Sequence, residues 1–119
     1  MLQKHSIMDI IFKTKKLEKI CNNRSHRERE CGTERAKKLG RRLDDLRAAN
    51  CLADMAKLPS TRCHELKGNR KGQISVDLDH PYRLLFTVAN DPVPVKSDGG
   101  LDWNNITAIK IIAVEDTHG

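Results

Sequence analysis

The sequence predicts an α+β fold, an antiparallel sheet with two N-terminal helices packed on one of its faces. Apolar residues recur at helical spacing only in the first half of the chain. After Pro59 they alternate with polar residues as strands do, and turns containing Gly or Pro separate the alternating segments. We therefore expect residues 1–119 to form a single domain, with residues 1–7 as a loose N-terminal extension.

The first half of the chain supplies one strand and the helices. Residues 8–12 are short, β-branched and aromatic, which favours a strand, and residues 14–21 carry apolar residues at helical spacing. The polar residues 22–32 predict a loop or a frayed helical turn, and Thr33 can cap a longer helix over residues 33–47. The apolar stripe of that helix would cover the sheet and consists of Ala36, Leu39, Leu43 and Leu46.

Four further strands are predicted in the second half. Residues 68–72 form a turn with glycine at both ends, and residues 79–81 form a tight turn before the next strand. Two prolines and two adjacent glycines mark residues 90–105 as a long loop. The predicted strands span residues 62–67, 73–78, 82–88 and 106–114.

The charge balance favours a polyanionic partner. Lys and Arg number 22 against 16 Asp and Glu, which gives a net charge of +6. A small basic domain of this kind suits nucleic acid, a ribosome or an acidic protein segment. No apolar run approaches the roughly 20 residues that span a bilayer, and no signal peptide is recognisable, so we expect a cytoplasmic protein without membrane contact.

The cysteines do not predict a metal site. Cys21, Cys31, Cys51 and Cys63 are far apart in the sequence and never form a Cys-x-x-Cys pair. Zinc sites need ligand pairs closely spaced on a turn, so we expect reduced structural cysteines and no cofactor.

Residues 62–72 carry the candidate chemistry. Four cations and His64 lie on a predicted strand and its turn, and the next hairpin returns Arg83 to the same sheet. A histidine can transfer protons near neutral pH, and cations around it can bind a phosphate and neutralise developing charge. These residues suit RNA cleavage without a metal, and they suit plain RNA binding equally well.

Three segments together resemble the RelE/ParE superfamily of bacterial toxins, and most closely its HigB-like, plasmid-maintenance killer branch. The first is the helix that contains Arg35-Ala36-Lys37-Lys38-Leu39 and Leu43-Asp44-Asp45-Leu46. The second is the strand and turn from His64 to Gln73, and the third is Tyr82-Arg83-Leu84-Leu85-Phe86. The terminal Asp116-Thr117-His118 matches an Asp-Tyr-His sequence of these toxins, and the resemblance covers about residues 8–118.

This resemblance implies a type II toxin that acts as an mRNA interferase, a ribosome-dependent endoribonuclease without a metal. In this family a 2′-hydroxyl attacks its own 3′ phosphate, and a cognate HigA-like helix-turn-helix antitoxin inhibits the toxin. The matching catalytic positions are His64, Arg83, Asp116 and His118. The candidate RNA- or phosphate-binding positions are Lys67, Arg70 and Lys71.

Two other functional classes stay open at this point. One is a ParE-like toxin directed at gyrase, against which the paired histidines argue. The other is a non-catalytic RNA- or antitoxin-binding module with a decayed site, favoured by Thr117 because threonine offers no ring for stacking on a base. The sequence also leaves open which histidine is the base and which is the acid.

Overall fold

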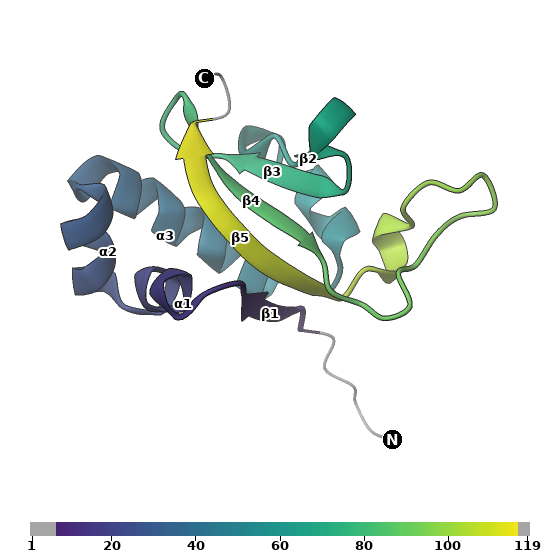
Figure 1. Ribbon diagram of the computed structural model, residues 1–119, viewed down its shortest axis with the longest axis horizontal. Coiled ribbons are helices and arrows are strands. Elements are labelled where there is room, and N and C mark those ends of the chain that lie inside the picture. Colours follow the sequence, from purple (N-terminus) through teal and green to yellow (C-terminus); the bar gives the residue numbers. More distant parts are fainter. Residues whose placement is uncertain (1–6, 117–119) are drawn as a thin grey trace.

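The computed structural model describes residues 7–116, which form a five-stranded sheet and three α-helices (Figure 1). The strand order is β1-β5-β4-β3-β2. The strands are β1 (Asp9–Phe12), β2 (His64–Glu65), β3 (Gln73–Asp77), β4 (Tyr82–Val88) and β5 (Ala108–Asp116). The helices are α1 (Lys15–Asn22), α2 (Arg24–Cys31) and α3 (Thr33–Ala48). The predicted α+β class is confirmed. The predictions made for residues 1–6 and 117–119 concern positions outside the described residues.

The sheet is mixed, because β1 pairs with β5 in parallel, whereas the other neighbouring strands are antiparallel. The expectation of a purely antiparallel sheet is wrong for this edge pair. No hairpin joins β1 to β5, so no tight turn fixes their relative direction. Apolar alternation gives the faces of a strand and carries no information on its direction.

The segment between the two predicted helices is itself a helix. Of the loop or frayed helical turn expected over residues 22–32, the loop is wrong, because α2 forms there as a regular helix without burying any residue. Polar contacts hold it: the Asn23 side chain caps its first turn, and Arg27 donates to the carbonyl oxygens of Ile20 and Cys21 at 3.1 and 2.9 Å. Such contacts leave no apolar period in the sequence, which explains why the pattern did not predict this helix.

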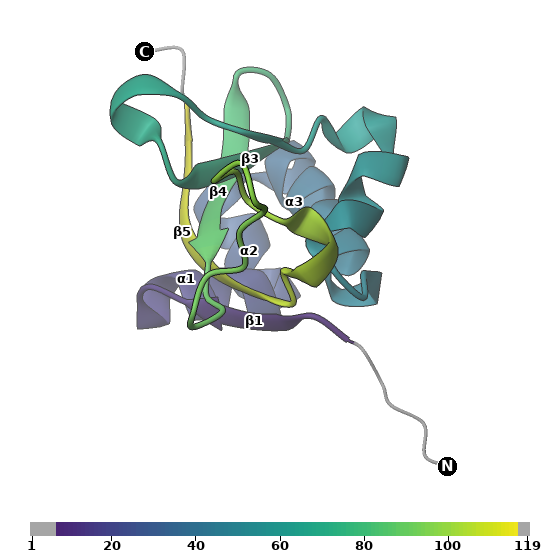
Figure 2. The same ribbon diagram turned by 90° about the vertical axis from the view of Figure 1, so that its right-hand side faces the viewer.

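Helix α3 covers one face of the sheet, as its apolar stripe predicts (Figure 2). Leu39, Leu43 and Leu46 are fully buried and pack in one cluster with Ile74 and Phe86 of β3 and β4. The expected Thr33 cap is wrong, because Thr33 is the first helical residue and the cap position is Gly32 with φ 81°. Only this left-handed glycine separates α2 from α3, so no side-chain cap forms there.

The strand predicted over residues 62–67 shrinks to the two residues of β2. Residue Arg62 adopts a left-handed conformation with φ 48°, which ends the 3-10 helix η2 (Pro59–Thr61) and cannot continue a strand. After β2 the chain enters the 3-10 helix η3 (Gly68–Arg70), which replaces the predicted turn. The remaining 3-10 helices are η1 (Leu52–Lys57) and η4 (Trp103–Asn105).

The long loop after β4 is anchored back to β2. Trp103 Nε1 donates to Glu65 Oε2 at 2.8 Å, and the Trp103 ring packs on the core. Val95 and Leu101 form an isolated bridge within the loop. No helix among the described residues is long and apolar enough to cross a membrane.

Candidate functional site

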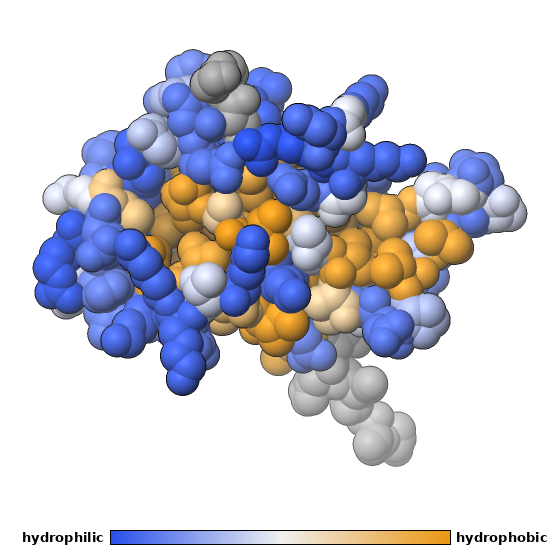
Figure 3. All heavy atoms as spheres, viewed as in Figure 1, coloured by the Kyte–Doolittle hydropathy of each residue, from blue (hydrophilic) through white to orange (hydrophobic). Residues whose placement is uncertain are grey.

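The face of the sheet opposite α3 combines an apolar band with charged borders (Figures 1 and 3). The band crosses the strands and runs toward the long loop. Large apolar side chains exposed in these regions include Ile11 of β1 and Val93 and Val95 of the loop. This open face therefore offers apolar surface beside its cations.

Two neighbouring rows of residues cross the open face. In the first row, His64 of β2 pairs with Ser75 of β3, which pairs with Leu85 of β4. In the second row, Arg83 of β4 pairs with Asp77 on one side and with Glu115 on the other. Ser75 and Asp77 are two residues apart in β3, and Leu85 and Arg83 are two residues apart in β4, so both rows share one face.

His64 and Arg83 therefore lie on the same face in adjacent rows. The strand spacing places their Cα atoms about 12 Å apart, which is close enough for both side chains to contact one group between them. The shared face is as expected from the sequence, and a common catalytic site stays a prediction.

The imidazole ring of His64 is fixed by a backbone carbonyl. Its Nδ1 lies 2.7 Å from the carbonyl oxygen of Arg62. A carbonyl oxygen only accepts hydrogen bonds, so Nδ1 carries the proton of the neutral ring. The other nitrogen, Nε2, is then the atom that gains or loses a proton.

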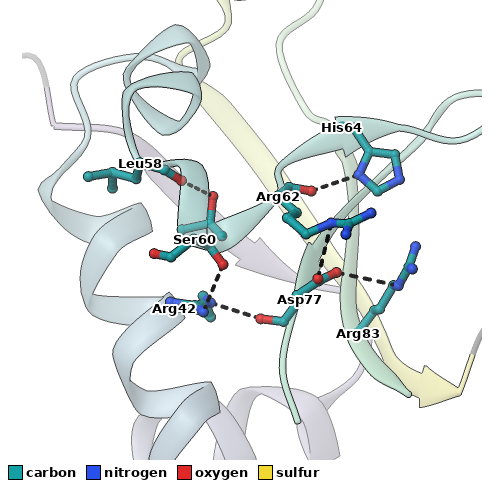
Figure 4. Close-up of polar contacts among 8 residues, drawn as sticks. Arg42, Leu58, Ser60, Arg62, His64, Asp77 and Arg83 are labelled. Atoms are coloured by element: carbon teal, nitrogen blue, oxygen red, sulfur yellow. Dashed lines mark hydrogen bonds and ion pairs between the residues drawn. The ribbon is translucent and has the colours of Figure 1, made fainter. Parts of the chain in front are cut away.

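One carboxylate lies between two arginines beside this histidine (Figure 4). Asp77 Oδ2 is 3.3 Å from Arg62 Nε, and Asp77 Oδ1 is 3.5 Å from Arg83 Nε. Arg42 of α3 supports the group from below: its Nε donates to the Asp77 carbonyl at 2.8 Å and its Nη2 donates to the Ser60 carbonyl at 3.2 Å. Two segments distant in sequence are thereby tied together at the site.

Arg70 crosses the open face. It leaves η3, donates to Gln73 Oε1 on β3 at 3.1 Å and reaches Glu115 Oε1 on β5 at 2.5 Å. Because β4 lies between those two strands, the side chain must pass over β4. Ser75 and Leu85 below are fully buried although they face away from α3. The candidate phosphate ligand Arg70 is thus paired with a carboxylate in the free protein.

The two lysines of the predicted site occupy different positions. Lys67 is exposed at the start of η3, close in sequence to His64. Lys71 instead lines a cavity of about 400 Å³ between the β3 start and the long loop, together with Val93 and Leu101. Lys67 is therefore close to the histidine along the chain, whereas Lys71 faces the loop cavity.

The C-terminal part of the predicted site is only partly described. Asp116 pairs with Tyr82, so strand alternation places its side chain opposite to the face of Arg83, and Glu115 takes the open-face position. His118 and Thr117 lie outside the described residues. Strand β5 nevertheless ends beside the start of β4, next to Arg83.

Three contributors to this face were predicted from the sequence only in part. Arg62 was counted among the four cations of residues 62–72 but was expected in a plain strand, and Glu115 was expected in the tail beyond the last strand. Asp77 or Asp79 was expected as a partner of Arg83 across the hairpin, and the structure pairs Arg83 with Asp77, because residues opposite one another across a hairpin share a face. The left-handed Arg62 has no signal in the sequence.

The cysteine next to His64 is not a reactive thiolate. Burial raises the pKa of the Cys63 thiol to about 12, so the group stays neutral at physiological pH. Among residues 7–116, no three His, Cys, Asp or Glu side chains gather as metal ligands would.

Comparisons with known proteins agree with this arrangement. A family model described as the RelE-like toxin of the type II toxin–antitoxin system HigB matches residues 10–96. The toxin HigB-1 of Vibrio cholerae serotype O1 (strain ATCC 39315 / El Tor Inaba N16961) is 36% identical over 80 residues, which cover 66% of this chain and 82% of that protein. The matched segment includes β2, β3 and β4 with His64 and Arg83. The chain therefore belongs to the HigB-like family of RelE-type toxins from type II toxin–antitoxin systems.

Proposed function

We propose that this toxin is a ribosome-dependent mRNA endoribonuclease that cleaves RNA without a metal ion. In this reaction the ribose 2′-oxygen attacks the adjacent phosphorus, and the bond from phosphorus to the 5′-oxygen breaks. The products are a 2′,3′-cyclic phosphate and a 5′-hydroxyl end. The chemistry needs a base for the 2′-proton, an acid for the 5′-oxygen and cations for the extra charge on the phosphate.

The observation that carries the proposal is the fixed ring of His64. Its Nδ1 donates to the Arg62 carbonyl at 2.7 Å, which leaves Nε2 as the proton acceptor. Arg83 lies on the same face one row away. We assign His64 as the general base that removes the 2′-proton.

Cationic side chains supply the charge neutralisation in this mechanism. Arg83 is held by Asp77 and has a side chain only 18% exposed, so its guanidinium is partly shielded from water. Such a preorganised cation stabilises charge on the phosphate better than a fully solvated one. Lys67 and Arg70 bind neighbouring phosphates in this proposal, with Arg70 leaving Glu115 when RNA arrives, and Lys71 contributes from the loop side.

The general acid is assigned to His118. Strand β5 leads toward this residue and ends beside Arg83. Asp116 orients or biases the acid from the strand end. These two roles rest on the family resemblance, because His118 lies outside the described residues.

The cellular partners follow from the same proposal. Type II toxins have an antitoxin partner. We propose a HigA-like helix-turn-helix antitoxin, an action on mRNA in the ribosome, and therefore a cytoplasmic location.

The proposal is tested by inducing the toxin and mapping new mRNA 5′ ends. A 5′-hydroxyl must be phosphorylated before it can be ligated to an adapter, so each sample is prepared with and without polynucleotide kinase. We expect new ends within translated regions that are captured only after kinase treatment. Cells expressing His64→Gln serve as the reference, and cells treated with a translation-initiation inhibitor test ribosome dependence.

Three results would change the assignment. Growth arrest without new RNA ends, accompanied by relaxed or cleaved DNA, would favour a gyrase-directed toxin. RNA binding without growth arrest or new ends would favour a non-catalytic module. New ends that are ligated without kinase would contradict the 2′-hydroxyl mechanism while leaving RNA cleavage in place.

A further inference from the structure

Asp77 is the meeting point of two arginines that come from different parts of the chain. Arg62 ends the η2 turn, and Arg83 lies on β4. Both contact the Asp77 carboxylate through Nε, at 3.3 Å for Arg62 and 3.5 Å for Arg83. Nε is the inner nitrogen of a guanidinium, so these contacts do not require the outer fork of either group.

The outer ends of both guanidinium groups point away from Asp77, toward the side where His64 lies (Figure 4). Two forks that face one space form a geometry suited to a phosphate, which accepts paired hydrogen bonds from arginine. His64 Nε2 borders the same side of the cluster, because Nδ1 is turned to the Arg62 carbonyl. A phosphate held there would have the proposed base beside it.

Two positive groups this close repel one another unless a negative group lies between them. The Asp77 side chain is 27% exposed, and its Oδ1 is closed to solvent without a hydrogen bond among the described residues. The carboxylate is thus placed for its ion pairs with the arginines. Water screens these contacts less than it would on an open surface.

The supports of the cluster are independent of any ligand. Arg42 fixes the carbonyl of Asp77 and the carbonyl of Ser60, two residues before Arg62. The buried Thr61 hydroxyl donates to the Leu58 carbonyl at 2.8 Å and holds the same turn. The left-handed Arg62 backbone thereby aims its carbonyl at His64, while its side chain reaches Asp77.

We infer that Arg62 and Arg83 form a two-arginine clamp for the RNA phosphate beside His64, and that Asp77 is the positioning residue that holds the clamp. This inference rests on the proposed function and names a phosphate ligand, Arg62, that the family resemblance does not assign. Asp77 acts through the arginines and does not touch the RNA.

The test compares two dinucleotides that differ in one charge. Both carry 2′-O-methyl ribose and cannot be cleaved; one has a phosphodiester linkage and the other a neutral methylphosphonate. Affinities are measured by NMR titration, with the arginine Nε–H signals followed directly. We expect the wild-type protein to prefer the phosphodiester by about tenfold, the size of one charge-assisted hydrogen bond.

Three variants decide the roles. Arg62→Gly removes the guanidinium and keeps the backbone conformation, because glycine adopts φ 48° without strain. We expect the ratio of the phosphodiester affinity to the methylphosphonate affinity to fall toward one. Asp77→Asn and Asp77→Ala should lower the same preference although they make the site more positive. Asp44→Asn is the control, since it removes one exposed carboxylate of α3 that pairs with Arg47, three residues further along the same helix.

The affinity ratio separates positioning from charge and from stability. A preference that stays at the wild-type value or rises in the Asp77 variants overturns the positioning role, because Asp77 would then be neutral or a competitor of the phosphate. An unchanged preference in Arg62→Gly overturns the clamp. If the Asp77 variants do not fold, the Arg62→Gly result alone decides the inference. A wild-type protein without any preference overturns the proposed phosphate site itself, and the inference with it.

Discussion

On the helix-covered face of the sheet, the fully buried side chains of β3 and β4 are Ile74, Val76, Leu84 and Phe86. On the open face of the same strands, Asp77 meets Arg83, and Arg70 passes across to Glu115. The first face is held by apolar packing, which is non-directional and tolerates small shifts. The second face carries charged groups that stabilise charge on a ligand only when they are held in the right positions.

This difference separates stability from function. Removing an apolar contact behind the sheet costs free energy of folding, because a cavity remains. Removing a partly exposed charge in front of the sheet costs little folding free energy. Substitutions on the two faces should therefore give opposite patterns of stability and activity.

The largest expected effect is on the open face. His64→Gln should reduce the RNA cleavage rate roughly 10²–10⁴-fold, since a positioned base is removed and glutamine cannot take up a proton at neutral pH. The rate is measured with ribosomes programmed with a defined mRNA, and thermal unfolding of the variant should match the wild type. His26→Gln, on α2, is the matched control and should keep full activity. Equal rates for both variants would remove His64 from the mechanism.

The helix-covered face should show the reverse pattern. Leu43→Ala should lower the free energy of unfolding by about 2–5 kcal/mol, because Leu43 is fully buried and α3 cannot collapse onto the gap. Urea unfolding followed by circular dichroism measures this loss. Ile11→Ala on the open face, where Ile11 is 50% exposed, should cost much less. Similar losses at both positions would mean that the open face is also packed in solution.

The Arg70–Glu115 pair tests the open face more finely. Glu115→Gln should change the free energy of unfolding by about 1 kcal/mol or less, since both side chains are more than a third exposed. It releases Arg70 for a phosphate, so RNA affinity should depend more steeply on salt, with the log–log slope growing by about 0.7. Fluorescence anisotropy with a single-stranded RNA measures the slope.

Asp44→Asn controls for the lost negative charge in that experiment. It removes a carboxylate whose side chain is 82% exposed on α3. Its slope should stay at the wild-type value. If Asp44→Asn and Glu115→Gln steepen the slope equally, the change reflects net charge and Arg70 is not released.

The smallest effect at neutral pH concerns Cys63, which packs against the core. Burial raises the pKa of its thiol from 9.0 to about 12, so the folded state holds the proton where the unfolded state loses it. Its contribution to stability is complete below pH 9 and is lost as the pH rises toward 12. In Cys63→Ala, the fall of stability between these pH values should be less steep, as measured by urea unfolding at each pH. If the free energy of unfolding falls equally with pH in the wild type and in Cys63→Ala, the Cys63 thiol has an ordinary pKa and is exposed to solvent.

Much of the fold was predictable because it depends on apolar periodicity. The stripe of α3 and the alternation of β3 and β4 identify the buried face without knowledge of the fold. The family, and the placement of His64 and Arg83 on one sheet, also followed from local sequence. Helix α2 and the parallel β1–β5 edge did not, because polar contacts and strand direction leave no periodic signal.

The sequence by itself determined which residue types are present: a histidine, several arginines and a net positive charge suited to RNA. Only the tertiary structure decided which carboxylate meets which arginine. Asp77 binds Arg62 and Arg83, whereas Asp79 pairs with Arg35 at 3.1 Å. Charges act over distances in space, and spacing along the chain does not fix those distances until the strands pair. The left-handed turn at Arg62, which orients His64, is likewise held by tertiary contacts: Arg42 of α3 donates to the Ser60 carbonyl, and Asp77 of β3 pairs with the Arg62 side chain.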